Sequence, residues 1–467
     1  MAKPGITYDT EDLWRKDRDH YVHPWTDFSV FKEEGSDVIA DGDGVYVYDA
    51  DGRRYIDGIG GLWCVNIGYG RAELAEAIRD QALRIPYYST FEHLTTPPAA
   101  ELAAKLAEIA PASLNRVFYG TGGSMANETA VRILHFYVNR LGKESKKKII
   151  SRLDAYHGST YLSAAITGVM ADRIGFDVAE GLVHHVSAPN TYRRPEGMGV
   201  EEFCDAKVKE LEDKVLELGA ENVACFIAEP IMGAGGVIVP PPGYHERTRE
   251  VCAKCDVFYI SDEVVTGFGR LGHFFASEPV FDIVPDLITC AKGITSGYLP
   301  LGATIFSDEI YDVISVPQAQ AGLFTHGFTY SGHPVSCAAA LANIEIMERD
   351  DVLGHVRRVG PYFEERLKTL LDLPLVGDVR GSHFMMCVEN VANKETKELL
   401  PLEVKIGNRI ARQAQKRGLI VRPLGHLNVL SPPLILTREQ IDEIVAILRA
   451  SIEAAQDDLA RERLWRG

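Results

Sequence analysis

The stretch Pro285-Asp-Leu-Ile-Thr-Cys-Ala-Lys292-Gly-Ile-Thr-Ser-Gly297-Tyr-Leu-Pro300 decides the fold that we expect for this chain. Its first part, residues 287–291, is a short apolar run typical of a buried strand, and a glycine-rich turn follows it. Lys292 stands at the junction, so its amine is expected at the edge of a sheet, where a ligand can reach it. Partial burial removes water from an ammonium group and makes the neutral, nucleophilic amine accessible near neutral pH. Such a lysine can bond covalently to an aldehyde; the alternative is a lysine that only ends a strand.

Short buried strands alternate with helix-length segments through the middle of the chain. The expected strands are residues 116–119, 149–150, 223–228, 257–261, 287–291 and 303–306. Helical periodicity is found at residues 102–109, 127–138 and 335–347. This alternation predicts an α/β fold with a mainly parallel central sheet and helices on both faces. Ligands of such sheets bind at the carboxyl ends of the strands.

The two ends of the chain have a different pattern. Residues 38–57 alternate apolar and polar residues between Asp-Gly turns, which predicts antiparallel strands. Residues 379–389 and 418–430 are also expected to be strands. Thr437-Arg-Glu-Gln440 is a capping box that begins an amphipathic helix. These segments are expected to pair into a second, smaller α+β unit.

We therefore expect two domains. Residues 1–70 and 346–467 would form the small domain, and residues 71–345 the large cofactor-binding domain. The N-terminal segment carries many aromatic residues without clear periodicity, among them Trp25. It is expected to pack over another part of the molecule.

Composition disfavours several classes of function. A net charge of −17 and a pI near 5.3 argue against a nucleic-acid partner, because phosphate contacts need clustered lysine and arginine. No apolar run reaches the roughly 18 residues of a membrane helix, and no signal peptide is found, so we expect a cytoplasmic protein. The eight cysteines lie mostly in apolar runs, as free thiols do in a reducing compartment. Cys252-Ala-Lys-Cys255 lacks a second pair nearby, so we expect no metal site.

Three features at the expected strand ends describe a cofactor pocket. Lys292 offers an amine, and Asp262 follows the expected strand 257–261. Gly120-Thr-Gly-Gly-Ser124 enters a helix, and such a turn presents backbone N–H groups and the positive helix end to a phosphate. Each feature alone is more often structural. Together, an amine for an aldehyde, a carboxylate for a protonated ring nitrogen and a phosphate site predict pyridoxal 5′-phosphate (PLP).

The sequence resembles the class III, or omega, aminotransferases of PLP fold type I over nearly its whole length. The resemblance is carried by Asn127-Glu-Thr-Ala, Tyr156-His-Gly-Ser, Ala228-Glu-Pro-Ile-Met-Gly-Ala-Gly-Gly236, and residues 262–270, 285–302, 326–334, 379–381 and 421–423. It implies an enzyme that transfers an amino group from a primary amine to an oxo-acid by a ping-pong mechanism. It also implies a homodimer, with a tetramer as the alternative.

The resemblance implies roles for individual residues. Lys292 would hold PLP covalently and transfer the proton, and Asp262 would pair with the pyridine nitrogen. The other expected cofactor contacts are Gly123 and Ser124 at the phosphate, Tyr156 and Val264 on the two ring faces, His157, Glu229, and Thr329 from the neighbouring subunit. The expected substrate contacts are Trp63, Phe91, Tyr156, Ala234 and Arg422.

Ala234 and Arg422 narrow the expected substrate. Relatives that act on ornithine or 4-aminobutyrate commonly have a glutamate where Ala234 stands, and that glutamate pairs with an arginine. Here Arg422 would be free to bind an oxo-acid carboxylate and to swing aside for an apolar amine. This favours the amine:pyruvate subgroup, acting on omega-amino compounds, diamines or aralkyl amines. The alternatives are a glutamate-1-semialdehyde-type aminomutase, a 4-aminobutyrate- or ornithine-type enzyme using 2-oxoglutarate, and a catalytically silent cofactor-binding protein.

Two residues depart from the family pattern. Met125 stands where the family usually has an acidic residue, which changes the polar contacts at the start of that helix. Glu92, beside Phe91, replaces an aromatic residue often found in the subgroup. We hypothesise that its carboxylate favours diamines such as putrescine, and the diamine-to-monoamine specificity ratio of Glu92→Gln tests this; the alternative is a solvated glutamate.

Overall fold

A seven-stranded sheet forms the centre of the molecule in the computed structural model, which describes residues 8–317 and 323–465. In spatial order its strands are β4 (Leu114–Gly120), β10 (Gly302–Ser307), β9 (Leu287–Cys290), β8 (Phe258–Asp262), β7 (Val223–Ala228), β5 (Lys148–Arg152) and β6 (Val183–Val186). Strand β10 is antiparallel to both of its neighbours, and the other pairs are parallel. The predicted, mainly parallel sheet is confirmed. The edge strand β6 was not predicted, because two histidines interrupt its apolar pattern.

Two layers of helices cover this sheet, and alternate residues of β7 contact them. Cys225 and Ile227 pack with residues of helix α6, whereas Phe226 and Ala228 pack with residues of α8 and α9. Successive side chains of a strand point to opposite faces, so a strand covered on both sides is apolar throughout. Strand β7 is accordingly buried along its whole length.

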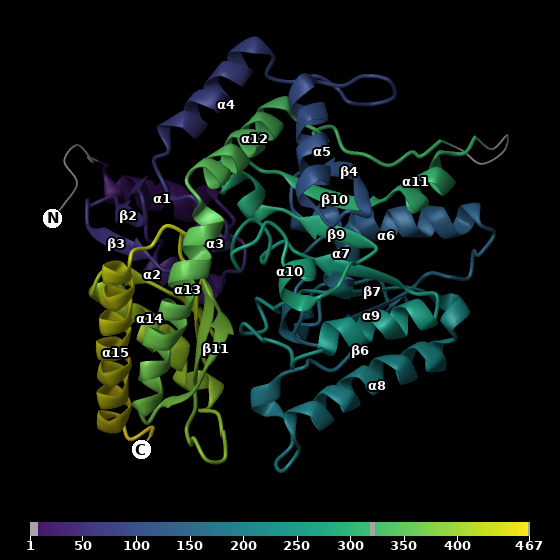
Figure 1. The fold of residues 1–467 in the computed structure, drawn as a ribbon. Helices are drawn as coiled ribbons and strands as arrows, with labels where there is room; N and C mark the ends of the chain where they lie inside the picture. Colours follow the sequence, from purple (N-terminus) through teal and green to yellow (C-terminus); the bar gives the residue numbers. More distant parts are fainter. Residues whose placement is uncertain (1–7, 318–322, 466–467) are drawn as a thin grey trace.

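The helices of the described residues have the following bounds (Figure 1). They are α1 (Thr10–His20), α2 (Phe28–Glu34), α3 (Gly60–Trp63), α4 (Ala72–Arg84), α5 (Pro97–Ile109), α6 (Gly123–Arg140), α7 (Tyr161–Ile166), α8 (Val200–Leu218), α9 (Tyr244–Lys254), α10 (Ser277–Phe281), α11 (Asp308–Ser315), α12 (Pro334–Arg349), α13 (Val352–Lys368), α14 (Ile406–Lys416) and α15 (Arg438–Arg461). The short 3₁₀ helices are η1 (Met170–Arg173), η2 (Thr191–Arg193), η3 (Ala220–Asn222), η4 (Lys292–Thr295), η5 (Thr369–Asp372) and η6 (Leu402–Val404). None of the helices in residues 8–317 and 323–465 is both long and apolar enough to cross a membrane.

Two smaller sheets lie beside the C-terminal helices. One has the order β1 (Ile39–Asp43), β2 (Tyr46–Asp49), β3 (Arg54–Asp57) and β13 (Leu419–Ile420), and the other β11 (Val376–Ser382), β12 (Met385–Asn390), β15 (Leu427–Leu430) and β14 (Arg422–Leu424). The predicted single strand at residues 379–389 is a hairpin of β11 and β12, with His383 in a left-handed conformation (φ 50°) at its turn. The turn at residues 383–384 contains neither glycine nor proline, and apolar residues follow it directly. The sequence therefore carries no signal that the strand is interrupted there.

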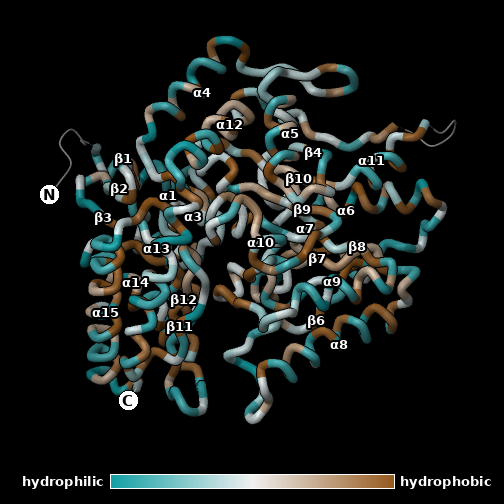
Figure 2. The backbone as a smooth tube through the Cα atoms, viewed as in Figure 1, coloured by the Kyte–Doolittle hydropathy of each residue, from teal (hydrophilic) through white to brown (hydrophobic). Residues whose placement is uncertain are grey.

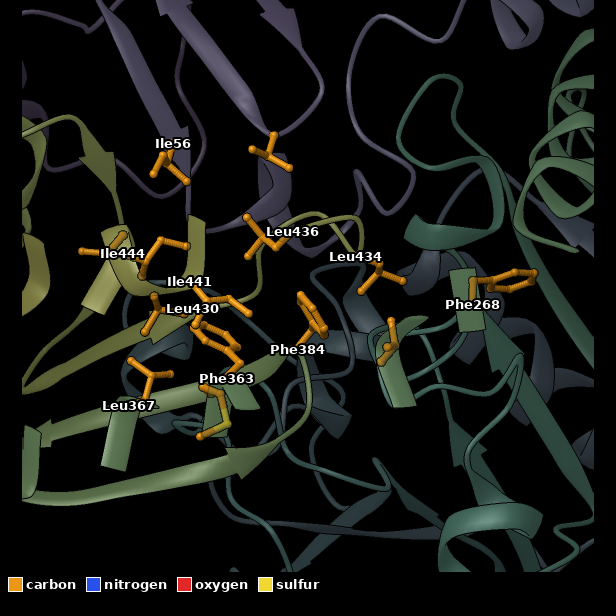
Figure 3. Packing of buried hydrophobic residues seen from close by; sticks show 14 of the residues in the cluster. Ile56, Phe268, Phe363, Leu367, Phe384, Leu430, Leu434, Leu436, Ile441 and Ile444 are labelled. Carbon is orange, nitrogen blue, oxygen red and sulfur yellow. The ribbon is translucent and has the colours of Figure 1, made fainter. Parts of the chain in front are cut away.

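The pairing of β3 with β13 brings the two ends of the chain together, as the purple and yellow segments on the left of Figure 1 show. Ile56 of β3, Phe363 of α13 and Ile441 of α15 belong to one buried cluster (Figure 3). Helix α15 begins at the predicted capping box. Hydrophobic and hydrophilic residues alternate along its backbone in Figure 2, and the hydrophobic ones among its buried residues include Ile441, Ile444 and Leu448. The shared core supports a small domain built from both ends; its boundaries at residues 70 and 345 stay a prediction.

Candidate active site

Lys292 follows strand β9 and begins the short helix η4. Its φ of 49° lies in the left-handed region, where a residue other than glycine costs on the order of 1–3 kcal/mol. Asn343 stabilises this turn by donating from Nδ2 to the carbonyls of Gly293, at 2.9 Å, and Ile294, at 3.1 Å. Burial lowers the pKa of the Lys292 ammonium, and the charges of Asp262 and Glu229 oppose this shift. The strained backbone conformation of Lys292 thus holds its desolvated amine at the end of the strand.

Asp262, the last residue of β8, is buried and held by hydrogen bonds. Its Oδ2 accepts from Asn127 Nδ2 at 2.7 Å and lies 2.7 Å from His157 Nδ1. Its Oδ1 accepts from the backbone N–H of Val264 at 3.0 Å. Thr289 in turn donates to Asn127 Oδ1 at 2.6 Å. These contacts fix the carboxylate in one orientation beside the cavity.

The amino end of α6 forms the third part of the site. Gly122 is its N-cap and offers no side-chain hydrogen bond, so the first N–H groups of an 18-residue helix lack intrahelical acceptors. A methyl group on Gly123 would lie 2.8 Å from Val264 Cγ1. The helix end therefore approaches the Asp262 loop as closely as glycine allows. An anion is stabilised at such a place by the N–H groups and the helix dipole.

Glu229 connects two walls of the site. Its carboxylate accepts from the backbone N–H of Tyr156 at 3.0 Å and of Gly233 at 2.8 Å. Burial raises the pKa of Glu229, while the charge of His157 and the N–H of Gly233 oppose this shift. Glu229 thereby positions Tyr156 and the glycine turn that contains Ala234.

All these groups face one cavity of about 750 Å³, within the range usual for small-molecule sites. Its lining includes Lys292, Asp262, Asn127, Gly123, Ser124, Tyr156, His157, Glu229, Val264, Trp63, Ala234 and Arg422. The edges of three neighbouring elements, β8, β9 and α6, thus converge on one space. An amine, a carboxylate and an uncapped helix end in one cavity suit a ligand that has a carbonyl group, a basic ring and a phosphate.

A comparison of the sequence with known protein families supports the same kind of ligand. The family profile described as Aminotransferase class-III matches residues 31–452.

The chain belongs to the class III aminotransferases.

Solved structures and curated relatives of this aminotransferase are similar over almost its entire length. An (S)-enantioselective omega-transaminase from Thermomicrobium roseum superposes with a TM-score of 0.93 at 42% identity, covering 96% of this chain and 99% of that one. The omega transaminase of Pseudomonas jessenii, solved in complex with PMP, has a TM-score of 0.93 at 38% identity, covering 96% and 99%. A putrescine–pyruvate aminotransferase of Pseudomonas aeruginosa is 41% identical over 93% of this chain and 94% of its own. The predicted fold, PLP fold type I, and amino-group transfer are confirmed.

The cofactor of this aminotransferase is PLP, as in the family, and the residues present fit it. Lys292 Nζ makes no hydrogen bond with the part of the chain that the structure describes, so it is free to react with the aldehyde. Asp262 would hold the protonated ring nitrogen, and the open end of α6 would hold the phosphate. The roles of the individual residues stay predictions from the family resemblance.

Two residues predicted for the site do not line the cavity of their own chain. Phe91 is half exposed and lies near Gly327, and Thr329 is exposed, with its carbonyl accepting from Tyr87 at 2.8 Å. The family resemblance already assigns Thr329 to the neighbouring subunit's site, and the substrate contact of Phe91 stays a prediction. Glu92 is exposed beside Phe91 and also lies outside this cavity.

The other departure from the family, Met125, has a local partner. Its sulfur accepts a hydrogen bond from the Thr121 hydroxyl at 2.8 Å. The methionine thus replaces an acidic side chain without leaving the start of α6 unpacked.

Several lining residues were not predicted as part of the site, and Asn127, Trp25 and Asp172 are three of them. Asn127 belongs to a motif quoted for the resemblance, and its bond to Asp262 could have been sought there. Trp25 lies 5.8 Å from the Tyr156 ring, as expected of an aromatic segment that packs over another part of the molecule. Asp172 lies in a turn without any local signal. Within the described residues, no cluster of histidine, cysteine and acidic side chains could hold a metal ion.

Proposed function

We propose that this aminotransferase transfers the amino group of a primary amine to pyruvate. The proposal rests on the observation that Arg422 lines the cavity without an ion-pair partner among the described residues. Ala234 and Trp63 line the same cavity. A desolvated guanidinium without a partner is a strong site for the carboxylate of a small oxo-acid. The apolar side chains around it suit the carbon chain of an amine that has no carboxylate.

Different residues of the cavity would have different roles in the transfer of the amino group. When bound, PLP supplies the aldehyde that accepts the amino group and the ring that withdraws electrons. Lys292, with its pKa lowered by burial, is placed to remove and return the proton of the donor carbon. Asp262 would place a negative charge at the ring nitrogen, and Tyr156 and Val264 would flank the ring. Glu229 and His157 hold these groups in place.

Replacing Arg422 by alanine tests the choice of acceptor. Because removing one member of a desolvated charge pair costs about 2–5 kcal/mol, kcat/KM for pyruvate is expected to fall about 100-fold. The half-reaction with an apolar amine should change little, since that donor has no carboxylate. Alanine formation measures the first quantity, and cofactor absorbance in the absence of oxo-acid measures the second.

Equal losses in both half-reactions would reject this role of Arg422. A wild-type enzyme that forms glutamate from 2-oxoglutarate but no alanine from pyruvate would favour the 4-aminobutyrate-type alternative. An enzyme that isomerises its substrate without net transfer would be an aminomutase. Arg417→Ala, a change to an exposed arginine on the C-terminal side of α14, serves as the matched control.

We further propose that the active unit is a homodimer. Tyr87, Tyr88, Phe91 and Tyr330 are exposed around Thr329, and the rings of Tyr87 and Tyr330 lie 5.9 Å apart. An exposed aromatic patch of this kind is typical of an interaction surface. In a two-fold symmetric dimer this patch would pack against the partner subunit, and symmetry would place Thr329 and Phe91 of each subunit at the other's cavity.

Thr329→Ala tests this arrangement through cofactor affinity. The loss of one hydrogen bond to a charged phosphate should raise the dissociation constant of PLP about 10-fold. Titration of the apoenzyme, followed by absorbance, gives this constant, and sedimentation gives the mass of the assembly. Thr396→Ala, at an exposed threonine far from the patch, should change neither. Unchanged affinity in a Thr329→Ala enzyme would exclude the contact.

We also propose a cytoplasmic location. All eight cysteines are free thiols, and six of them are buried. Free cysteines are typical of a reducing compartment.

A further inference from the structure

Asp172 is a carboxylate in the active-site cavity that the proposed mechanism does not use. It belongs to η1 and lines the same cavity as Tyr156 and Arg422. Its side chain is half-buried and accepts no hydrogen bond from the part of the chain that the structure describes. A carboxylate that lines the cavity and has no donor from the described chain is open to a cationic ligand.

The charges of Asp172 and Arg422 influence each other without pairing. Burial raises the pKa of Asp172, and the positive charge of Arg422 opposes this only in part. Burial likewise lowers the pKa of Arg422, with Asp172 and Tyr156 opposing it. The two groups form no ion pair, so the cavity presents this carboxylate and this guanidinium at separate places. A carboxylate substrate suits the guanidinium and a cationic substrate the carboxylate. Asp154 is a second lining carboxylate that the mechanism does not use.

A chain of hydrogen bonds connects the turn that contains Asp172 with Asp262. Arg173 donates from Nε to the carbonyl of Thr167 at 3.1 Å. Its Nη2 donates to the carbonyl of Ala165. The Thr167 hydroxyl accepts from the backbone N–H of His157 at 2.9 Å, and His157 contacts Asp262. Asp172 is therefore held in a fixed position relative to Asp262 rather than on a free loop.

We propose that Asp172 binds the second, protonated amino group of a diamine donor while the first amino group reacts beside Lys292. This inference rests on the proposed function and specifies its donor. Aliphatic amines have a pKa near 10, so a diamine enters with both ends charged. Placing the distal ammonium in a largely apolar cavity is costly unless a carboxylate accepts its hydrogen bonds. Asp172 supplies that carboxylate, and Arg422 serves the oxo-acid in the other half-reaction.

Asp172→Asn tests the proposal with two donors of equal length, putrescine and butylamine. The amide keeps the size of the side chain and removes its charge. Loss of a hydrogen bond between charged groups should lower kcat/KM for putrescine about 10-fold relative to butylamine, mainly through KM. The ratio of the two donors is measured on one preparation, so a change in the amount of folded enzyme cancels. Asp177→Asn, at an exposed carboxylate outside the cavity, should leave the ratio unchanged.

The outcomes separate this inference from the proposed function. If the wild-type enzyme transfers no amino group from either donor to pyruvate, the proposed function fails and the inference with it. If both donors react and Asp172→Asn leaves their ratio unchanged, the inference alone is overturned. The same ratio in Glu92→Gln distinguishes the two carboxylates: a decrease there, without one in Asp172→Asn, assigns the distal amine to Glu92.

Discussion

Lys292→Ala is expected to lower kcat by about 10⁴-fold, because a positioned general acid–base commonly contributes 10²–10⁴-fold and this lysine also holds the cofactor. The amine of Lys292 lies at the end of β9 and lines the cavity. Burial lowers its pKa, and the charges of Asp262 and Glu229 oppose this shift. Alanine can neither move the proton nor bond the aldehyde. Steady-state alanine formation from pyruvate measures the loss.

Lys147→Ala is the matched control for this change. Lys147 is also partly desolvated, with a lowered pKa, but it contacts Asn139 and the carbonyl of His135 outside the cavity. Its replacement should leave kcat within a factor of about two, as most changes away from a site do. Full turnover in Lys292→Ala would remove the basis of the proposed chemistry.

Asp262→Asn is expected to lower kcat by about 10³-fold, the upper range found when one preorganised electrostatic contact is removed. The amide keeps the volume and can still meet His157 and Val264, but it has no negative charge for the ring nitrogen. Fold and cofactor content should persist, because Lys292 and the α6 amides remain. The absorbance of bound cofactor and the rate of the amine half-reaction report the two effects separately.

Asp286→Asn provides the comparison at a structural aspartate. Asp286 accepts from the backbone N–H of Tyr259 at 2.7 Å and pairs with Arg249, at the opposite end of the same strand β8. This change should lower thermal stability but not kcat per bound cofactor. A similar fall in kcat in both variants would show that Asp262 acts only through the stability of the sheet.

The cavity residues Lys292, Asp262, Gly123 and Ser124 could be predicted because each follows a strand or begins a helix. Lys292, Asp262 and the Gly123–Ser124 turn stand where local apolar patterns end, and parallel strands place their carboxyl ends at one edge. The pattern of short strands likewise predicted the central sheet. These are local signals, and the structure brings their residues to one cavity.

Other parts depend on contacts between distant segments. Asp172 lies in a 3₁₀ turn, and the hydrogen bonds of Arg173 to residues 165 and 167 help to hold that turn at the cavity. Trp25 reaches Tyr156 from a segment 131 positions away, and no periodicity indicates such a contact. The hairpin at His383 was missed because its turn lacks glycine and proline. Tertiary packing decides these features.

The most direct test of the account is to locate the covalent attachment of the cofactor. The holoenzyme is reduced with borohydride, digested, and analysed by peptide mass spectrometry. The account predicts a pyridoxyl group on the peptide that contains Lys292, and none on that peptide without reduction. A label on a different lysine, or no label on an active, cofactor-loaded enzyme, would contradict it.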